Sequence, residues 1–504
     1  MMNETGKSRR SAIDMSAVEF REAGHLLVDR IAAFLETLPA RPITPGESAR
    51  AVRKLIGQGN LPTKGTPAVT LVEEIAPLLF DHSLHNGHPR FFGYITSSAA
   101  PLGALADLLA AAVNQNVAMW DLAPVASEIE AQTIRWLAEL VGFGKTCGGL
   151  MVSGGNMANF LGFIAARRAK APWNIRETGT YGDPRRLMVY ASRETHTWIQ
   201  KAADVGGLGT AAIRWIETDA QQRMNVASLR RQLHEDVAAG YLPFMVVGTA
   251  GNVSTGAVDP LPAIHEVARE HGLWFHVDGA YGAPAAALPE AAEDLRGLAL
   301  ADSVALDPHK WLYSPLEAAC ILVREHAHLL DAFSYRPPYY HLERDDEEPG
   351  NDYYEHGMQN SRGFRALKVW LGLRHLGREG YCQLMRDNIA LAAQLFREAR
   401  AHEEIEACTH NLSITTFRYV PRDLQPGKDA VDRYLNELNM ALLPKLKSGG
   451  ELYVSNAVVD GKYVLRACIV NFRTTSSDVA AVPTLVARVG RDVDDALRPA
   501  ELRR

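Results

Sequence analysis

Short runs of apolar residues recur between about Gly148 and Val323, without the polar alternation of a half-exposed strand. Seven runs stand out: GGLMV, RRLMVYAS, AAIRWIET, LPFMVVGTA, GLWFHVDGA, DSVALD and AACILV. Such runs are typical of strands that are covered on both faces. Amphipathic stretches such as NVASLRRQLHEDVAAG and PLPAIHEVAREHG separate them. The pattern predicts a large α/β domain with a mostly parallel, seven-stranded sheet.

The segments on either side of this region have a different pattern of apolar residues. From Ser16, SAVEFREAGHLLVDRIAAFLETL has apolar residues at helical spacing and ends before the proline-rich connector PARPITPGE. Past Arg362, two amphipathic helices precede the strand-like stretches LSITTFRYV and YVLRACIVN. At 504 residues the chain exceeds the size of a single core. We therefore predict an N-terminal helical segment and connector (1–98), a large α/β domain (99–375) and a small C-terminal α+β domain (376–504).

Composition and charge exclude several classes of protein. Charged residues make up 22% of the chain and the net charge is −6, so no basic surface is expected to hold a nucleic acid. The five cysteines include no CxxC pair, which favours a reducing, cytoplasmic location. The opening residues lack the apolar core of a secretory signal. The apolar stretch 99–120 is interrupted by Asp107, Asn114 and Asn116, which favours a buried helix over a membrane span. We expect a soluble protein.

Candidate chemistry follows the predicted strands, because ligands bind at the carboxyl ends of strands in parallel sheets. After GGLMV comes SGGNMAN, a glycine-rich turn into a helix that starts near Asn156. Free N–H groups beside Gly154 and Gly155 suit a phosphate group. A tight strand-to-helix turn without a ligand explains this motif equally well.

Three further polar residues follow other strands: His196, Asp278 and Lys310. Taken singly, each has an ordinary structural explanation: a core histidine, an Asp-Gly turn and a surface lysine. An acid that ends an apolar strand is nevertheless costly unless a cation meets it. An anion site, a flat imidazole, a buried carboxylate and a lysine amine together are the parts that hold pyridoxal phosphate.

The lysine and the acid have complementary tasks in this interpretation. A free lysine has a pKa of about 10.4 and is a poor nucleophile at neutral pH. Burial among Pro308, Trp311 and Leu312 predicts a lowered pKa for Lys310, so that its amine can form a Schiff base with the aldehyde. The negative charge of Asp278 favours a protonated pyridine nitrogen, which withdraws electrons from the substrate.

Five motifs, DPHKW, HVDGAYG, THTWIQKA, SGGNMAN and HPRFFGY, resemble the motif set of the group II pyridoxal-dependent decarboxylases. That family includes the aromatic L-amino acid, histidine and glutamate decarboxylases. The similarity runs from about Phe20 to the start of the C-terminal domain. It implies the PLP-dependent transferase fold of type I and pyridoxal 5′-phosphate as cofactor. It also implies a homodimer with active sites at the subunit interface, in which the N-terminal segment wraps the partner.

The resemblance also implies roles for individual residues. Lys310 is similar to the Schiff-base lysine, Asp278 to the pyridinium partner and His196 to the histidine that stacks on the ring. The expected cofactor contacts are completed by Gly155, Asn156, Asn252, Ala280, Asp307 and His309. The family often has asparagine at the position of Asp307, and a carboxylate there would repel a phosphate group.

Two neighbouring positions depart from the family's pattern as well. The family often has serine or threonine at the position of Asn156. In GTAGNVSTGAVDP, Asn252 and Val253 stand where the family's GTT loop carries threonines, so that a hydroxyl contact is replaced.

The segment FSYRPPYYHLERDDEEPGNDYYEH resembles the family's mobile catalytic loop. The resemblance places Tyr339, with Tyr340 a close rival, as the group that protonates Cα after carbon dioxide leaves. A solvated acidic loop without chemistry is the alternative interpretation. Relatives with phenylalanine at this position tend to form aldehydes, so tyrosine favours simple decarboxylation.

The substrate pocket is expected to draw on two segments. HPRFFGYITSS supplies Phe92, Tyr94 and Ser97 to its wall, and NQNVAMWDLAP is expected to reach in from the partner with Ala118, Met119 and Trp120. An aromatic side chain suits such a pocket. Aromatic-selective relatives often carry a bulky ring near the position of Ala118, which leaves the pocket shape open.

We therefore expect decarboxylation of an L-amino acid, preferably aromatic, to the amine and carbon dioxide. The alternatives within this chemistry are an oxygen-consuming aldehyde synthase and a decarboxylase of glutamate, histidine or diaminobutyrate. A nicotinamide-dependent oxidoreductase requires GxGxxG, and SGGNMAN fails that spacing. A metal hydrolase could use His276, Asp278 and His309, and a non-catalytic dimer would bind no cofactor.

Overall fold

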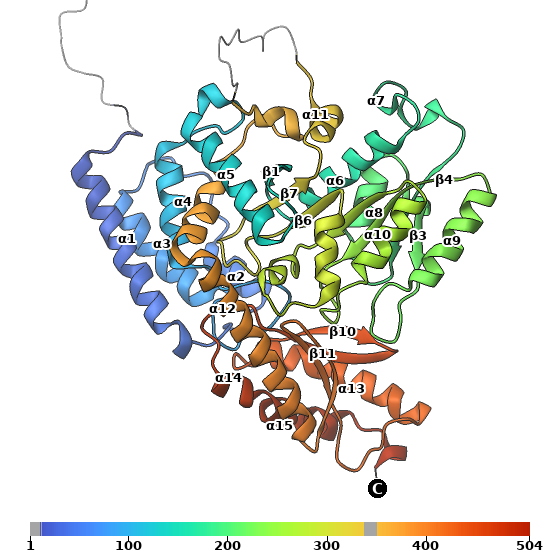
Figure 1. Cartoon of the computed structure of the whole chain (residues 1–504). Coiled ribbons are helices and arrows are strands. Elements are labelled where there is room, and N and C mark those ends of the chain that lie inside the picture. Colours follow the sequence, from blue (N-terminus) through green and yellow to red (C-terminus); the bar gives the residue numbers. More distant parts are fainter. Residues whose placement is uncertain (1–10, 12, 337–349, 504) are drawn as a thin grey trace, which may run out of the picture.

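The computed structural model describes residues 11, 13–336 and 350–503 of the chain. A seven-stranded sheet with helices on both faces forms the larger part, and a four-stranded sheet with its own helices forms the C-terminal part (Figure 1). This arrangement confirms the predicted α/β fold with a smaller α+β unit.

All seven apolar runs form strands of the large sheet. Their order is β1-β7-β6-β5-β4-β2-β3, and only β7 runs antiparallel to its neighbours β1 and β6. The strands are β1 (Gly148–Val152), β2 (Leu187–Ser192), β3 (Ile213–Ile216), β4 (Leu242–Thr249), β5 (Trp274–Asp278), β6 (Ser303–Leu306) and β7 (Ala319–Val323). Every residue of β1, β2, β5, β6 and β7 is buried, which explains why these strands lack polar alternation.

Helices between the strands cover this sheet. They are α5 (Pro124–Leu140), α6 (Gly155–Lys170), α7 (Ile175–Thr178), α8 (Trp198–Val205), α9 (Val226–Ala238), α10 (Leu261–Glu270) and α11 (Ala327–Phe333). Helix α6 packs against β4, β5, β6 and β7. Its N-terminus lies where the parallel strands have their carboxyl ends. The sheet and these helices share one apolar core.

The N-terminal helices lie along one side of the molecule (Figure 1). They are α1 (Ala17–Thr37), α2 (Ala49–Ile56), α3 (Ala68–His82) and α4 (Pro101–Val113). Ser16 begins α1 with a capping box to Glu19. The buried helix predicted within 99–120 is present as α4, but in the single chain it is only partly buried. Leu105, Leu108 and Val113 of α4 are 54%, 52% and 56% exposed, because α4 packs on α12 (Ala366–Ala401) with one side only.

The C-terminal unit contains an antiparallel sheet in the order β10-β11-β9-β8. Its elements are β8 (Ile405–Asn411), β9 (Ile414–Tyr419), α13 (Asp429–Ser448), β10 (Ser455–Val459), β11 (Lys462–Cys468), α14 (Ser476–Ala480) and α15 (Val482–Leu497). The two helices expected past Arg362 form the single element α12, which is interrupted at Gly377, where φ is 63°. The expected boundary at 375/376 falls at this interruption and stays a prediction.

The motif HPRFFGY joins the N-terminal segment to the C-terminal sheet. The N–H of Phe92 donates to the carbonyl of Tyr453 at 2.7 Å, and the N–H of Cys468 donates to the carbonyl of Phe92 at 2.9 Å. Phe92 is fully buried in the C-terminal core, because the segment runs beside that sheet. Within the described ranges, no helix has both the length and the apolar character needed to span a bilayer.

Candidate active site

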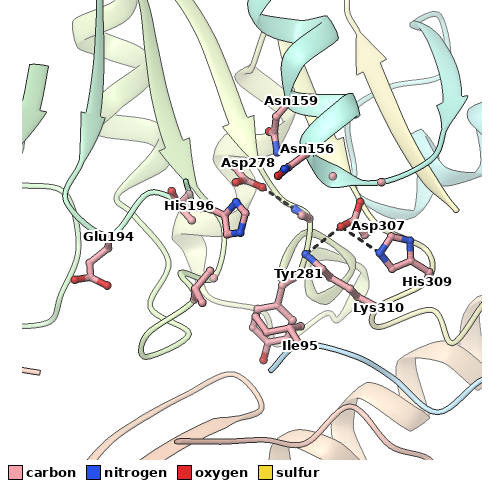
Figure 2. A pocket seen from close by; sticks show the side chains of 16 residues that line it. Ile95, Asn156, Asn159, Glu194, His196, Asp278, Tyr281, Asp307, His309 and Lys310 are labelled. Carbon is pink, nitrogen blue, oxygen red and sulfur yellow. Dashed lines mark hydrogen bonds and ion pairs between the residues drawn. The ribbon is translucent and has the colours of Figure 1, made fainter. Parts of the chain in front are cut away.

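A cavity of about 260 Å³ opens at the carboxyl ends of the central strands (Figure 2). It collects the residues that directly follow β1, β2, β4, β5 and β6, as expected for a parallel sheet. The lining residues are Ile95, Gly154, Gly155, Asn156, Asn159, Glu194, His196, Thr249, Gly251, Val253, Asp278, Ala280, Tyr281, Asp307, His309 and Lys310. Eight residues expected from the sequence as catalytic or cofactor contacts are among them: Gly155, Asn156, His196, Asp278, Ala280, Asp307, His309 and Lys310.

Asp278 ends β5 and presents a fully partnered carboxylate to the cavity. Its Oδ2 accepts a hydrogen bond from Nε1 of Trp198 at 2.8 Å. Its Oδ1 accepts a hydrogen bond from the N–H of Ala280 at 3.2 Å. Because both oxygens have donors, the side chain has a fixed orientation and no unpaired oxygen although it is buried.

Lys310 reaches the same cavity from the turn after β6. Its Nζ lies 3.0 Å from Oδ2 of Asp307. Burial disfavours the ammonium, but the negative charges of Asp307 and Asp278 outweigh it, and the pKa of Lys310 is raised. The sequence-based prediction of a lowered pKa is therefore wrong for this structure, because it counted the apolar neighbours and not the ion pair.

The N-terminus of α6 forms the other end of the site. The first N–H groups of a helix have no acceptor within the helix and carry the positive end of its dipole. A Cβ on Gly155 would lie 2.6 Å from Oδ2 of Asp307, so only glycine allows this close approach. His309 lies beside them: its Nε2 is 3.6 Å from Oδ2 of Asp307, and its Nδ1 accepts a hydrogen bond from the N–H of Ala318. Burial lowers the pKa of His309.

His196 lies between β2 and α8 and faces the cavity (Figure 2). Its Nδ1 accepts a hydrogen bond from the N–H of Trp198 at 3.3 Å. Burial lowers the pKa of His196, so the ring is neutral at pH 7. A neutral flat ring in this position is suited to pack against a planar cofactor, which stays a prediction.

The expected cofactor contact Asn252 does not line this cavity. Its Nδ2 donates to the carbonyl of Gln222 at 2.9 Å, and its Oδ1 accepts from the N–H of Thr255 at 2.8 Å, so its amide braces the loop after β4. Val253 and Thr249 line the cavity instead, and Oγ1 of Thr249 is buried with no hydrogen-bond partner in the part of the chain that the structure describes. Thr249 could have been found from the sequence, because it ends an apolar run.

Most of the expected substrate contacts do not line this cavity. Phe92 belongs to the C-terminal core and does not line the cavity, as described above. Tyr94 is 50% exposed and packs against Lys447, whose Nζ lies 5.1 Å from the ring centroid. Ser97 is buried and donates to the carbonyl of His309 at 2.9 Å, so it supports the turn that carries the lysine. From this segment, Ile95 lines the cavity.

Trp120 lines a different surface hollow, where its Nε1 donates to Glu128 at 2.9 Å. Its contribution to a partner's site, with Ala118 and Met119, stays a prediction. Tyr339 lies outside the described residues, as does Tyr340.

Sequence reasoning missed several lining residues besides Thr249. Asn159 is one helical turn beyond Asn156 on α6, and its Oδ1 lies 2.7 Å from Nε2 of His276. Tyr281 stacks on Trp311 with ring centroids 5.0 Å apart. Glu194 precedes His196 by two residues. Proximity to a predicted site residue is the signal that could have found Asn159 and Glu194.

Comparison with known proteins agrees with this geometry. Residues 52–420 match the family model described as the pyridoxal-dependent decarboxylase conserved domain. The chain therefore belongs to the pyridoxal-dependent decarboxylases. It is 32% identical to an aromatic-L-amino-acid decarboxylase of Bacillus atrophaeus, over 95% of this chain and 97% of that one. It is 31% identical to a phenylacetaldehyde synthase of Petunia hybrida, over 90% of each chain.

Solved structures confirm the fold. The chain is similar to Oryza sativa TDC, solved with PLP and tryptamine, with a TM-score of 0.88 and 27% identity over 96% of this chain and 99% of that one. Pyridoxal phosphate is the cofactor of the family, and the cavity fits it. The first turn of α6 suits its phosphate end, and Asp278 and Lys310 suit its ring and aldehyde.

Proposed function

We propose that this decarboxylase converts an aromatic L-amino acid into the corresponding amine and carbon dioxide. One observation carries the proposal: the amine of Lys310, the carboxylate of Asp278, the ring of His196 and the N-terminus of α6 face one cavity. When bound, pyridoxal phosphate supplies an aldehyde for an amine and a heterocycle that accepts electrons from the bond that breaks.

Individual residues of this chain would have the following roles in the reaction. Lys310 would hold the cofactor through its amine. Asp278, fixed by Trp198 and Ala280, keeps a proton on the ring nitrogen. His196 packs against the ring and keeps it in place. Tyr339 returns a proton to Cα.

An aromatic substrate is supported by the relatives and by the cavity wall. Ile95, Val253 and Tyr281 contribute apolar surface to the cavity. The relatives named above are an aromatic-L-amino-acid decarboxylase and a protein solved with tryptamine. A planar side chain gains most from burial against such surfaces.

We further propose a homodimer that works in the cytoplasm. Helices α3 and α4 each expose leucine or isoleucine side chains, including Leu71, Ile75, Leu105 and Leu108, between 45% and 54% exposed. Exposed large apolar side chains of this kind suit a subunit interface. The five cysteines are free thiols, which suits a reducing compartment.

The direct test incubates the purified protein, loaded with pyridoxal phosphate, with each proteinogenic amino acid and with 2,4-diaminobutyrate. Amine and carbon dioxide are measured together. We expect the highest kcat/KM for tryptophan, tyrosine or phenylalanine, with equal yields of amine and carbon dioxide. Preferential release of amine from glutamate, histidine or diaminobutyrate would contradict the substrate class and leave the reaction class intact.

A phenylacetaldehyde synthase among the relatives favours a second candidate function, oxidative conversion of the substrate to an aldehyde. Tyr339 favours the amine, so we expect little aldehyde or peroxide from the wild type. The variant Tyr339→Phe should shift the product ratio toward aldehyde and peroxide. Stoichiometric peroxide from the wild type would establish the synthase instead.

A further inference from the structure

Asp307 is an unusual carboxylate for a phosphate-binding end of a site. It is 1% exposed and directly follows β6. Its Oδ2 contacts Nζ of Lys310 at 3.0 Å, whereas its Oδ1 is buried and has no hydrogen-bond partner among the described residues. A buried acceptor without a donor costs about 1–3 kcal/mol. The orphaned oxygen therefore indicates that a further group completes this site.

The same carboxylate lies against the first turn of α6. A Cβ on Gly155 would be 2.6 Å from Oδ2 and 3.0 Å from Oδ1 of Asp307. This helix end is also the anion site that Gly155 and Asn156 offer to the phosphate of the cofactor. Without a proton on one of them, a carboxylate and a phosphate group at one helix end repel each other.

We propose that Asp307 is a proton-accepting phosphate contact: its carboxylate takes up one proton when the phosphate binds and then donates a hydrogen bond to a phosphate oxygen. One O–H bond forms on Asp307 and one proton leaves the solvent, with no change in oxidation state. The inference rests on the cofactor of the family and is independent of the substrate and product proposed above.

The surrounding charges are consistent with this role. On its own turn, Asp307 faces Lys310 and the imidazole of His309; across the cavity stand Asp278, His196 and Glu194, and α6 contributes no charged group there. Both oxygens of Asp278 already accept hydrogen bonds from the protein. An arriving phosphate dianion adds negative charge beside Asp307 and so raises the proton affinity of its carboxylate.

Protonation of Asp307 has a consequence for Lys310. The carboxylate 3.0 Å from Nζ is one of the charges that raise the pKa of Lys310. A proton on Asp307 removes that charge. The lowering of the pKa of Lys310 by burial is then opposed by less negative charge. Cofactor binding would in this way move Lys310 toward the reactive, neutral amine.

The test measures how many protons the full-length apoenzyme takes up from solution when a ligand binds. Two ligands are compared by titration calorimetry at about pH 8, where a phosphate monoester is a dianion. Pyridoxine 5′-phosphate carries the phosphate but no aldehyde, and pyridoxine carries neither. Repeating each titration in two buffers of different ionisation enthalpy gives the number of protons taken up.

We expect the wild type to take up about one proton more with pyridoxine 5′-phosphate than with pyridoxine. Asp307→Asn should lose this difference and bind pyridoxine 5′-phosphate more tightly. Because binding takes up a proton, the wild-type affinity should fall as the pH rises, by up to about tenfold per pH unit relative to the variant. Affinity for pyridoxine should show no such difference.

Glu194→Gln is the matched control. It removes a negative charge from the same cavity, at the side away from Asp307 (Figure 2), and should keep the wild-type proton count. An equal count for both ligands in the wild type would overturn the inference, and this comparison requires no variant. An unchanged count in Asp307→Asn would also overturn it, because the proton would then reside on the phosphate.

Discussion

Asp278 ends β5, Asp307 follows the neighbouring strand β6, and the two acids face the same cavity but differ in how their oxygens are held. Trp198 and the backbone of Ala280 donate to both oxygens of Asp278. Asp307 has Lys310 on one oxygen and no hydrogen-bond partner on the other among the described residues. The difference arises from the packing behind each strand, since α8 brings an indole donor to Asp278 and α6 brings glycine backbone to Asp307. One residue type at neighbouring strand ends can therefore have both oxygens held by donors at one end of a site and one oxygen without a donor among the described residues at the other.

The largest effect is expected from Lys310→Ala, which removes the cation that both acids face. We expect kcat/KM to fall by about 10⁴-fold or more, because the group that carries the cofactor is lost. Borohydride treatment followed by mass spectrometry should attach the cofactor to the wild type and leave the variant unmodified. Retained attachment in the variant would show that another amine holds the cofactor.

Asp278→Asn should have the next largest effect. The amide keeps the shape of the side chain but loses the charge that holds a proton on the ring nitrogen, so kcat should fall by about 10²–10⁴-fold. Cofactor affinity, measured by quenching of tryptophan fluorescence, should change much less. An Asp278→Asn variant with wild-type kcat would contradict the assignment of two different roles to the two acids.

Trp198→Phe tests how much the fixed orientation of Asp278 contributes. The variant removes one hydrogen bond to a charged group, worth about 1.5–3 kcal/mol, and kcat should fall by about tenfold or more. In a double-mutant cycle with Asp278→Asn, the two effects should be less than additive, since the indole acts through the carboxylate. Full additivity of the two changes in activation free energy would assign Trp198 a separate role in packing.

The smallest effect is expected for a matched pair of glycine substitutions at the other end of the site. A Cβ at position 155 meets Asp307 at 2.6 Å, whereas a Cβ at position 154 meets only Cε1 of His309, at 4.0 Å. Gly155→Ala should therefore weaken pyridoxal phosphate binding by about 1–3 kcal/mol, and Gly154→Ala should change it little. Both dissociation constants come from equilibrium titration of the apoenzymes, and equal effects would contradict the close approach of α6 to Asp307.

Local patterns were sufficient to predict the sheet and the strand-end residues of the site. Each of the seven apolar runs is a strand, because burial on both faces imposes an unbroken apolar pattern on a few consecutive residues. The pattern gave no information about which element covers an apolar residue. Phe92 was therefore assigned to the pocket although it packs in the C-terminal core, and the apolar residues of α4 were assigned to the interior although many are exposed.

The sequence by itself determined that Asp278, Asp307 and Lys310 meet at one cavity, because the carboxyl ends of parallel strands lie at one edge of the sheet and these residues end or follow β5 and β6. Only the tertiary structure decided which partners hold them and in which direction the pKa of Lys310 is shifted. Trp198 reaches Asp278 across 80 residues of sequence, and the pKa of Lys310 is raised by an ion pair against the effect of burial. Electrostatic interactions depend on distances between groups that folding brings together, and the order of residues along the chain does not specify those distances.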